Sequence, residues 1–240
     1  MIGNRLIKNK KQNTGNLLLD IYQCLYHFYG PLNWWPGDSP LEVMVGAILT
    51  QNTNWKNVQK ALYQLKKEKL LDIDILHHIS EKELSQYIVP CGYYQVKARR
   101  LKNFIHFFYQ KYEGSVKKMF SVDWQPLRVE LLSINGIGPE TADSILLYAG
   151  EKPTFVVDAY TRRIFGRHQW IPRSESYQYF QEIFINNLPS NLNLYREFHA
   201  QIVMVGKQFC KKANPDCKAC PLYSFVRNNK RLCNTPEFFT

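Results

Sequence analysis

The sequence predicts an all-α protein of about ten helices joined by short loops. Apolar residues recur at three- and four-residue steps along most of the chain. Leu17, Ile21, Leu25 and Phe28 show this spacing in the first helix, which is expected to end near Gly30. Alternating patterns typical of strands are nearly absent. No internal repeat or low-complexity segment interrupts the helical pattern.

Nine further segments carry helical spacing. Residues 41–49 are apolar almost all round, which indicates a helix at the centre of a core. The best strand candidate, residues 154–157, is too short to form a sheet. The other expected helices are residues 58–65, 81–87, 95–109, 124–132, 139–148, 160–165, 176–185 and 194–207.

The composition limits the classes of function. The chain has 31 Lys and Arg against 20 Asp and Glu, a formal net charge of +11. This excess suits a polyanionic partner, although charge alone does not identify one. No apolar run approaches the roughly 18 residues that a membrane-spanning helix needs. Residues 1–13 are polar and basic, which argues against a secretory signal, so a cytoplasmic protein is expected.

The sharpest local signal is Gly136-Ile137-Gly138-Pro139, which lies between two expected helices. The two glycines permit positive φ and close backbone approach, and Pro139 suits the first position of a helix. Such a hairpin directs backbone amides and a helix N-terminus outward, where a phosphate oxygen can bind. The candidate phosphate-binding residues are Gly136, Ile137, Gly138 and Thr141; the alternative is a plain turn between helices.

Asp158 follows Gly138 by twenty residues, where a short apolar run ends and a helical pattern begins. The simplest interpretation is a helix N-cap, a position that aspartate fills well. A capping carboxylate can also face a cleft, so a chemical role is compatible with capping. Arg162 and Arg163 follow on this helix as either solvated or phosphate-contacting residues.

Four cysteines crowd into the last part of the chain: Cys210, Cys217, Cys220 and Cys233. In an intracellular protein such crowding favours ligation over disulfides. The Cys217-x2-Cys220 spacing can place two thiolates on one metal centre. Both an iron–sulfur cluster and zinc accept four thiolates, so these residues alone leave both open.

Together, the glycine hairpin, Asp158 and the four-cysteine loop resemble the endonuclease III branch of the helix-hairpin-helix DNA glycosylases, over about residues 15–233. The resemblance implies a 4Fe-4S cluster on the four cysteines and a catalytic role for Asp158. Leu49-Thr50-Gln51-Asn52-Thr53 is similar to a helix end that inserts glutamine into the duplex. Gln51 is therefore an insertion candidate, with a structural hydrogen bond as the alternative.

The expected architecture is two helical lobes with a DNA-binding cleft between them. Residues 32–152 would form a six-helix lobe containing the hairpin. Residues 1–31 and 153–240 would form the other lobe, with the cysteine loop, and Asp158 would lie where the chain crosses back. The expected partner is double-stranded DNA with a damaged base, bound by a monomer. On the last long helix, His199 is expected in the core and Lys207 as a solvated or phosphate-contacting lysine.

Two departures from the family pattern matter. Bifunctional members carry a lysine nucleophile where this chain has Glu140, and a carboxylate cannot form the Schiff base that strand cleavage requires. The resemblance therefore implies a glycosylase without lyase activity.

The other departure is the twelve-residue gap before Cys233, where the family usually has about five residues; a longer loop closes at small entropic cost.

The tandem tryptophans before the central helix, Trp34 and Trp35, and the aromatic residue two positions after Thr53, Trp55, resemble the pattern of the 3-methyladenine DNA glycosylase subgroup. An aromatic cage would recognise a cationic methylated purine by stacking and cation–π attraction; packing in a core is the alternative. The expected reaction is removal of an alkylated purine such as 3-methyladenine. The alternatives are a thymine-glycol or mismatch thymine/uracil glycosylase, and a non-catalytic DNA-binding iron–sulfur protein.

Overall fold

The computed structural model describes residues 3–34 and 37–226, and every regular element within them is helical. The predicted all-α class is therefore confirmed. These residues form twelve α-helices rather than about ten. Two of the additional helices, α4 (Ile73–His78) and α7 (Val116–Phe120), are too short to show a periodic pattern in the sequence.

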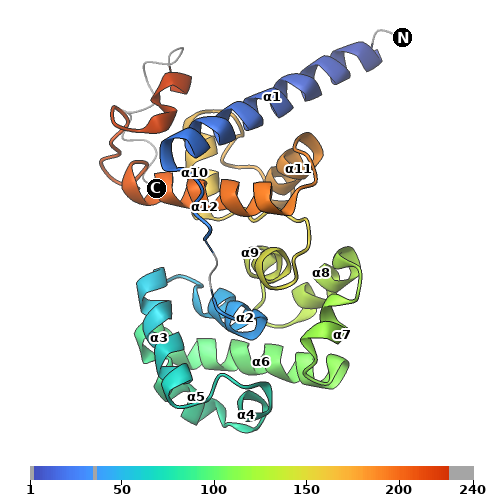
Figure 1. Cartoon of the computed structure of the whole chain (residues 1–240), viewed down its shortest axis with the longest axis vertical. Helices are drawn as coiled ribbons and strands as arrows, with labels where there is room; N and C mark the ends of the chain where they lie inside the picture. Colours follow the sequence, from blue (N-terminus) through green and yellow to red (C-terminus); the bar gives the residue numbers. More distant parts are fainter. Residues whose placement is uncertain (1–2, 35–36, 227–240) are drawn as a thin grey trace. The chain divides into compact units, whose positions relative to one another are not determined.

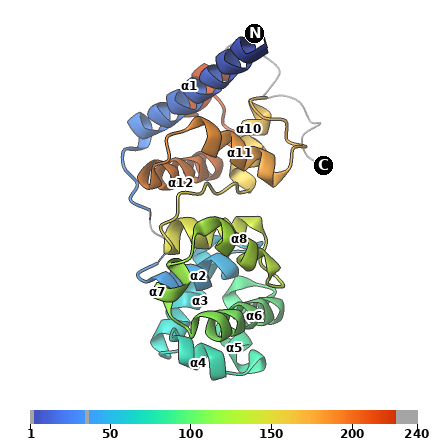
Figure 2. The same ribbon diagram turned by 90° about the vertical axis from the view of Figure 1, so that its right-hand side faces the viewer.

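The chain divides into two compact units (Figures 1 and 2). Residues up to Trp34 and from Pro153 onward form unit 1, and the residues between them form unit 2. The first junction thus follows Trp34 rather than residue 31. The described part of unit 2 holds eight α-helices, more than the six expected.

Unit 2 is organised around α2 (Pro40–Leu49), which packs against α3, α6, α9 and η2. Val45, Ile48 and Leu49 are fully buried, as predicted for a helix that is apolar on nearly every side. The other elements of unit 2 besides α4 and α7 are α3 (Trp55–Lys67), α5 (Glu81–Tyr87), the 3-10 turn η1 (Val89–Cys91), α6 (Tyr94–Tyr112), α8 (Trp124–Ser133), α9 (Pro139–Ser144) and the π-helical turn η2 (Ile145–Ala149).

Unit 1 is built on α12 (Leu192–Gln208), which packs against α1 and α10 in both views (Figures 1 and 2). Stacked aromatic rings fill its core, with the Phe155 and Phe184 centroids 4.0 Å apart. No described helix offers a stretch that is both long and apolar enough to cross a membrane. The remaining elements are α1 (Gly3–Tyr29), α10 (Ala159–Arg167), α11 (Tyr177–Asn187) and the 3-10 turn η3 (Pro221–Val226).

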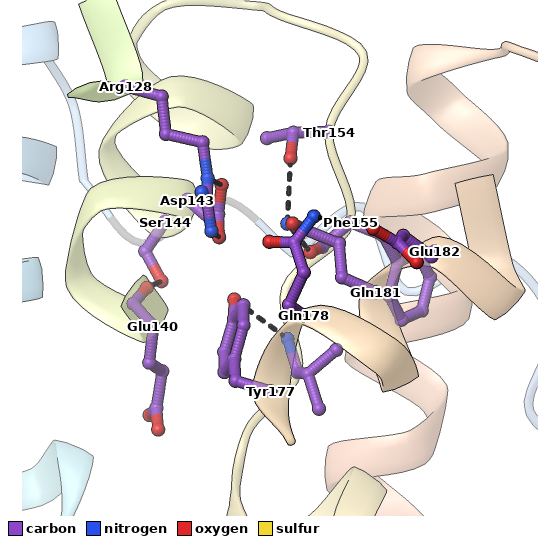
Figure 3. A network of polar contacts seen from close by, with 11 residues as sticks. Arg128, Glu140, Asp143, Ser144, Thr154, Phe155, Tyr177, Gln178, Gln181 and Glu182 are labelled. Atoms are coloured by element: carbon purple, nitrogen blue, oxygen red, sulfur yellow. Dashed lines mark hydrogen bonds and ion pairs between the residues drawn. The ribbon is translucent and has the colours of Figure 1, made fainter. Parts of the chain in front are cut away.

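Residues 154–157 form a buried segment without strand pairing, as expected from their short length. Gln181 of α11 donates from Nε2 to the Thr154 hydroxyl at 3.0 Å and to the Phe155 carbonyl at 2.8 Å. The Val157 N–H donates to the Tyr177 hydroxyl at 3.2 Å (Figure 3). Side chains of α11 thus replace the missing strand partner and fix the chain just before Asp158.

Candidate functional site

Asp158 is the N-cap of α10, the predicted structural role. Its Oδ1 accepts from the Thr161 N–H at 2.7 Å and from the Thr161 hydroxyl at 2.9 Å. Its Oδ2 lies 3.7 Å from Nε2 of His199, which is on α12. The two carboxylate oxygens therefore have different surroundings: the cap holds Oδ1, while Oδ2 faces the histidine.

The pKa of Asp158 lies below its ordinary value, although the residue is only 8% exposed. Burial by itself would raise this pKa, because a charged carboxylate loses hydration. The polar contact and the electrostatic interaction with His199 oppose this effect of burial, as do the two hydrogen bonds from Thr161. The net effect is to keep the carboxylate ionised at neutral pH.

Trp34, which precedes α2 in the chain, packs against α12 beside these groups. Its ring stacks on His199 with the centroids 5.9 Å apart and the planes inclined by 27°, and Nζ of Lys207 lies 5.8 Å from the Trp34 ring centroid. Glu197 anchors the preceding residues, because its carboxylate accepts from the Leu32 and Asn33 N–H groups, each at 2.8 Å.

Asp158, His199, Trp34 and Lys207 thus form one polar and aromatic group within unit 1. We call these four residues the Asp158 site. Trp35, which the sequence places in the same base pocket, lies outside the described residues.

The glycine hairpin joins α8 to α9 in unit 2. Gly136 has φ of +97°, and a Cβ there would lie 2.3 Å from Cγ of Arg100, so only glycine fits. Gly138 is the N-cap of α9 in extended backbone, with open space around it, and Pro139 follows at the first helical position. Ile137 is buried, so this apolar side chain holds the hairpin onto unit 2.

A buried ion pair fastens the two helices of the hairpin. Arg128 of α8 donates from Nε and Nη2 to the two carboxylate oxygens of Asp143 on α9, at 2.8 and 2.9 Å (Figure 3). The Asp143 side chain is fully buried, and that of Arg128 is 16% exposed. Because this two-point contact fixes both the distance and the angle between α8 and α9, it sets the orientation of the turn between them.

Gln51 contacts the hairpin through the nitrogen of its amide and α6 through the oxygen. Its Nε2 donates to the Gly136 carbonyl at 2.9 Å and to the Thr141 hydroxyl at 3.0 Å, and its Oε1 accepts from Arg100. The Thr141 side chain is buried under this contact.

Lys97, which is 2% exposed, sits behind Gln51. It donates from Nζ to the Leu49 carbonyl at 2.9 Å and to the Cys91 carbonyl at 2.7 Å. Burial lowers the pKa of Lys97. The lysine therefore caps the end of α2 from which Gln51 projects.

Trp55 begins α3 and is partly exposed. A Cβ on Gly46 would lie 3.2 Å from Cη2 of Trp55, so the edge of the indole packs on α2. Part of this tryptophan thus contributes to packing, while the remainder stays accessible. Glu140, at the position of the family's lysine, lies in the exposed first turn of α9, and its side chain points away from the Arg128–Asp143 pair (Figure 3).

Three of the four predicted ligands, Cys210, Cys217 and Cys220, line one pocket after α12. Arg167 donates from Nη1 to Sγ of Cys210 at 3.3 Å. Burial raises the pKa of Cys220 to about 11. Within the described residues no three side chains already converge as a metal site, and Cys233 lies outside those residues. Cys210 and Cys220 are free thiols and fit a thiolate-ligated group, with the Arg167 guanidinium to offset its negative charge. Cys217, by contrast, is disulfide-bonded in this structure rather than free as the predicted ligand role requires.

The two arginines that follow Asp158 donate hydrogen bonds within the protein, so the alternative of a plainly solvated helix face is wrong for them. Arg163 is 8% exposed and donates to the carbonyls of Cys210 and Gly206 at 2.7 and 3.1 Å. Arg162 donates to the carbonyls of Arg173 and Glu175. Both guanidinium groups satisfy buried or loop carbonyls, so neither simply covers a solvated helix face.

Comparison with known proteins identifies the family. The model described as "HhH-GPD superfamily base excision DNA repair protein" matches residues 45–190. The chain belongs to this family and is a DNA glycosylase of base excision repair. It is 47% identical over 217 residues to the putative DNA repair glycosylase MJ1434 of Methanocaldococcus jannaschii, covering 90% of this chain and 98% of that protein.

Two solved structures are similar. The H. pylori 3-methyladenine DNA glycosylase MagIII, bound to 1,N6-ethenoadenine, matches with a TM-score of 0.70 and 28% identity, over 81% of this chain and 97% of that one. Endonuclease III in a non-covalent complex with DNA matches with a TM-score of 0.77 and 22% identity, over 90% and 97%. The second likeness shows the fold alone. The resemblance to the helix-hairpin-helix glycosylases drawn from the sequence is confirmed.

Several residues of these sites were not found from the sequence. His199 was assigned to the core; it is buried, but it also faces Asp158. Lys97 could have been noticed as a lysine among apolar helix positions. For Glu197 and Gln181 no local signal exists, because their partners are distant in the chain.

Proposed function

We propose that this protein is a monofunctional DNA glycosylase that hydrolyses the bond between deoxyribose and a damaged purine, such as 3-methyladenine. The observation that carries the proposal is the ionised, buried carboxylate of Asp158, with one oxygen fixed by Thr161 and the other beside His199. A carboxylate in this state can stabilise a sugar that becomes electron-poor as the base departs.

The lowered pKa of Asp158 favours one role for this residue in the proposed reaction. A carboxylate that holds its negative charge strongly is a weak base but an effective electrostatic partner for an oxocarbenium-like sugar. Asp158 would therefore stabilise the positive charge and orient a water for attack at C1′. Asp158 would accept a proton from the water only after the new C–O bond has made that water more acidic.

The base pocket would be formed by Trp34, Trp35 and Trp55. A base turned out of the stack needs aromatic surface to replace its lost stacking, and an indole offers the largest such surface. The position of Trp34 next to His199 would bring the base close to Asp158. The likeness to a 3-methyladenine glycosylase at 28% identity supports a damaged purine as the substrate.

Strand cleavage is not part of the proposed activity, because Glu140 occupies the position of the lysine nucleophile. A carboxylate lacks the amine that forms a Schiff base at C1′. Water would then be the nucleophile, and the product would be an intact strand with an abasic site.

The hairpin would bind the DNA backbone. The amides that begin α9 and the open space around Gly138 suit a phosphate oxygen, and Gly136 and Ile137 would shape the turn. Because the Thr141 hydroxyl is engaged by Gln51, Thr141 would contribute through its backbone N–H. Gln51 would enter the space left by the extruded base after releasing Gly136 and Thr141.

Cys210, Cys217, Cys220 and Cys233 would hold a 4Fe-4S cluster, with zinc as the alternative. Such a centre would tie the loop after α12 to α10, because Arg167 contacts both the Cys210 sulfur and the carbonyls of Lys211 and Lys212. Its proposed role is structural, since it lies at the far end of α10 from Asp158.

The test is single-turnover base release by Asp158→Asn on a panel of duplexes, each with one damaged or mismatched base, followed by alkali. Asparagine preserves the helix cap, so the fold and the affinity for duplex should remain. Release should fall by about two to three orders of magnitude. Unchanged release would refute the role of Asp158, and release of thymine or uracil alone would favour the mismatch alternative.

Borohydride trapping tests the absence of lyase activity in the same reactions. No covalent protein–DNA adduct should form with the wild-type protein, because no lysine would attack C1′ during turnover. An adduct at any lysine would overturn the monofunctional assignment. The Asp158→Asn protein is the background control.

A further inference from the structure

Lys207 has a place in the Asp158 site that its position near the end of α12 did not suggest. His199 and Lys207 are eight residues apart, about two helical turns, and both approach Trp34. Lys207 is exposed as a residue, yet its ammonium group lies 5.8 Å from the indole centroid. Partial desolvation lowers the pKa of Lys207, while the charge of Asp158 raises it.

This arrangement changes what Trp34 can recognise. The indole already has one cation nearby, so a cationic methylated purine stacked on it would meet a like charge as well as an aromatic face. A purine that is neutral before cleavage meets no such repulsion. An ammonium group would instead attract the negative charge that this base acquires as it leaves.

The difference follows from the electrons of the glycosidic bond. When the bond from C1′ to an N3- or N7-methylated purine breaks, its electron pair neutralises the positive base. When the bond to a neutral purine breaks, the same pair leaves the base as an anion that needs a nearby positive charge or a proton. In both cases water adds hydroxide to C1′ and gives its proton to Asp158 and then to solvent.

We propose that Lys207 determines the range of bases that this enzyme releases, by stabilising the negative charge of a departing neutral purine beside Trp34. Cationic purines leave without this help because their bonds are already weak. The inference rests on the proposed function, since it assigns Lys207 to the base side of the same Asp158 site.

The experiment measures single-turnover release from two duplexes that differ only in the lesion: 1,N6-ethenoadenine, which is neutral, and 7-methylguanine, which is cationic. Lys207→Met should lower ethenoadenine release by about 10- to 100-fold, and leave 7-methylguanine release unchanged or faster. Lys207→Arg keeps the charge and should retain most of the ethenoadenine activity. Lys82→Met, at an exposed lysine of α5, is the matched control.

Each outcome decides whether Lys207 determines the range of bases released. Equal losses on both duplexes in Lys207→Met, or a wild-type enzyme that releases only 7-methylguanine, would overturn the role of Lys207. No release of either base by the wild-type protein would instead overturn the proposed purine substrate. Thermal unfolding and affinity for undamaged duplex, compared with Lys82→Met, report whether Lys207→Met is folded. If it is misfolded, the same two release rates are compared between Lys207→Arg, which keeps the charge, and Lys207→Gln, which removes it.

Discussion

Asp158 combines two roles that are usually separate. As an N-cap it satisfies a backbone N–H of α10 through Oδ1, and as an ionised group it presents Oδ2 toward His199. The cap holds the carboxylate in place, so the proposed reaction would need little reorganisation as charge develops on a bound sugar. His199, which faces the carboxylate, would act in that reaction as a positioning residue.

Replacing His199 with glutamine should move the low-pH side of the pH profile of base release, its acid limb, to higher pH. The histidine is the main influence that holds the pKa of Asp158 down against burial, so its loss should raise that pKa. Since the ionised form is the active one in the proposed reaction, activity should then be lost at a higher pH than in the wild type.

The measurement is the single-turnover rate from about pH 3 to pH 8, because the acid side of the wild-type profile lies below the ordinary pKa of an aspartate. His106→Gln, at an exposed histidine of unit 2, is the control and should keep the wild-type profile. An acid limb that does not move in His199→Gln would show that the histidine only fills space.

The hairpin is an element held together by an internal ion pair. Arg128 and Asp143 are both largely shielded from water, and removing one charge would deprive the other of the counter-charge it faces in this pair. Asp143→Asn should therefore lower the free energy of unfolding by about 3 kcal/mol or more. Affinity for duplex should fall as well, because the two helices of the hairpin would no longer be held at one angle.

Denaturant unfolding and duplex titration measure these effects. Glu113→Gln removes a comparable pair to Lys118, but one that is mostly exposed, and it should cost no more than about 1 kcal/mol. If the two variants are equally stable, the buried pair does not support the hairpin.

The two hairpin glycines should respond differently to alanine. Gly136→Ala would force a side chain into positive φ and against Arg100, so stability should fall. Gly138→Ala meets open space at an ordinary φ, so stability should be unchanged. If phosphate approaches this point, the added methyl group should still weaken duplex binding. Thermal unfolding with fluorescence anisotropy separates the two effects, and normal duplex binding by Gly138→Ala would place the phosphate elsewhere.

At the scale of the whole molecule, the cysteine loop should carry iron. Purified protein should be yellow-brown and contain about four iron atoms per chain, as a 4Fe-4S cluster requires. Cys210→Ser should lose the colour and lower the melting temperature, since the loop after α12 would lose its anchor. Cys24→Ser removes a cysteine outside the pocket and should keep the iron. Colourless protein that contains zinc would refute the iron–sulfur assignment.

The sequence by itself determined the helical class, the hairpin and the cap at Asp158. Each of these depends on spacing between neighbouring residues, and local backbone physics acts over the same short distances. The two short helices were missed for the same reason, because five or six residues do not establish a period.

Only the tertiary structure decided which groups meet at a site. Glu197 anchors the residues before Trp34, and His199 faces Asp158, across separations that no local pattern records. Lys97, Arg100 and Gln51 likewise converge because α2 packs on α6. Such contacts are set by how apolar faces pack. The local sequence around a polar residue on one helix therefore does not show which distant residue will become its partner.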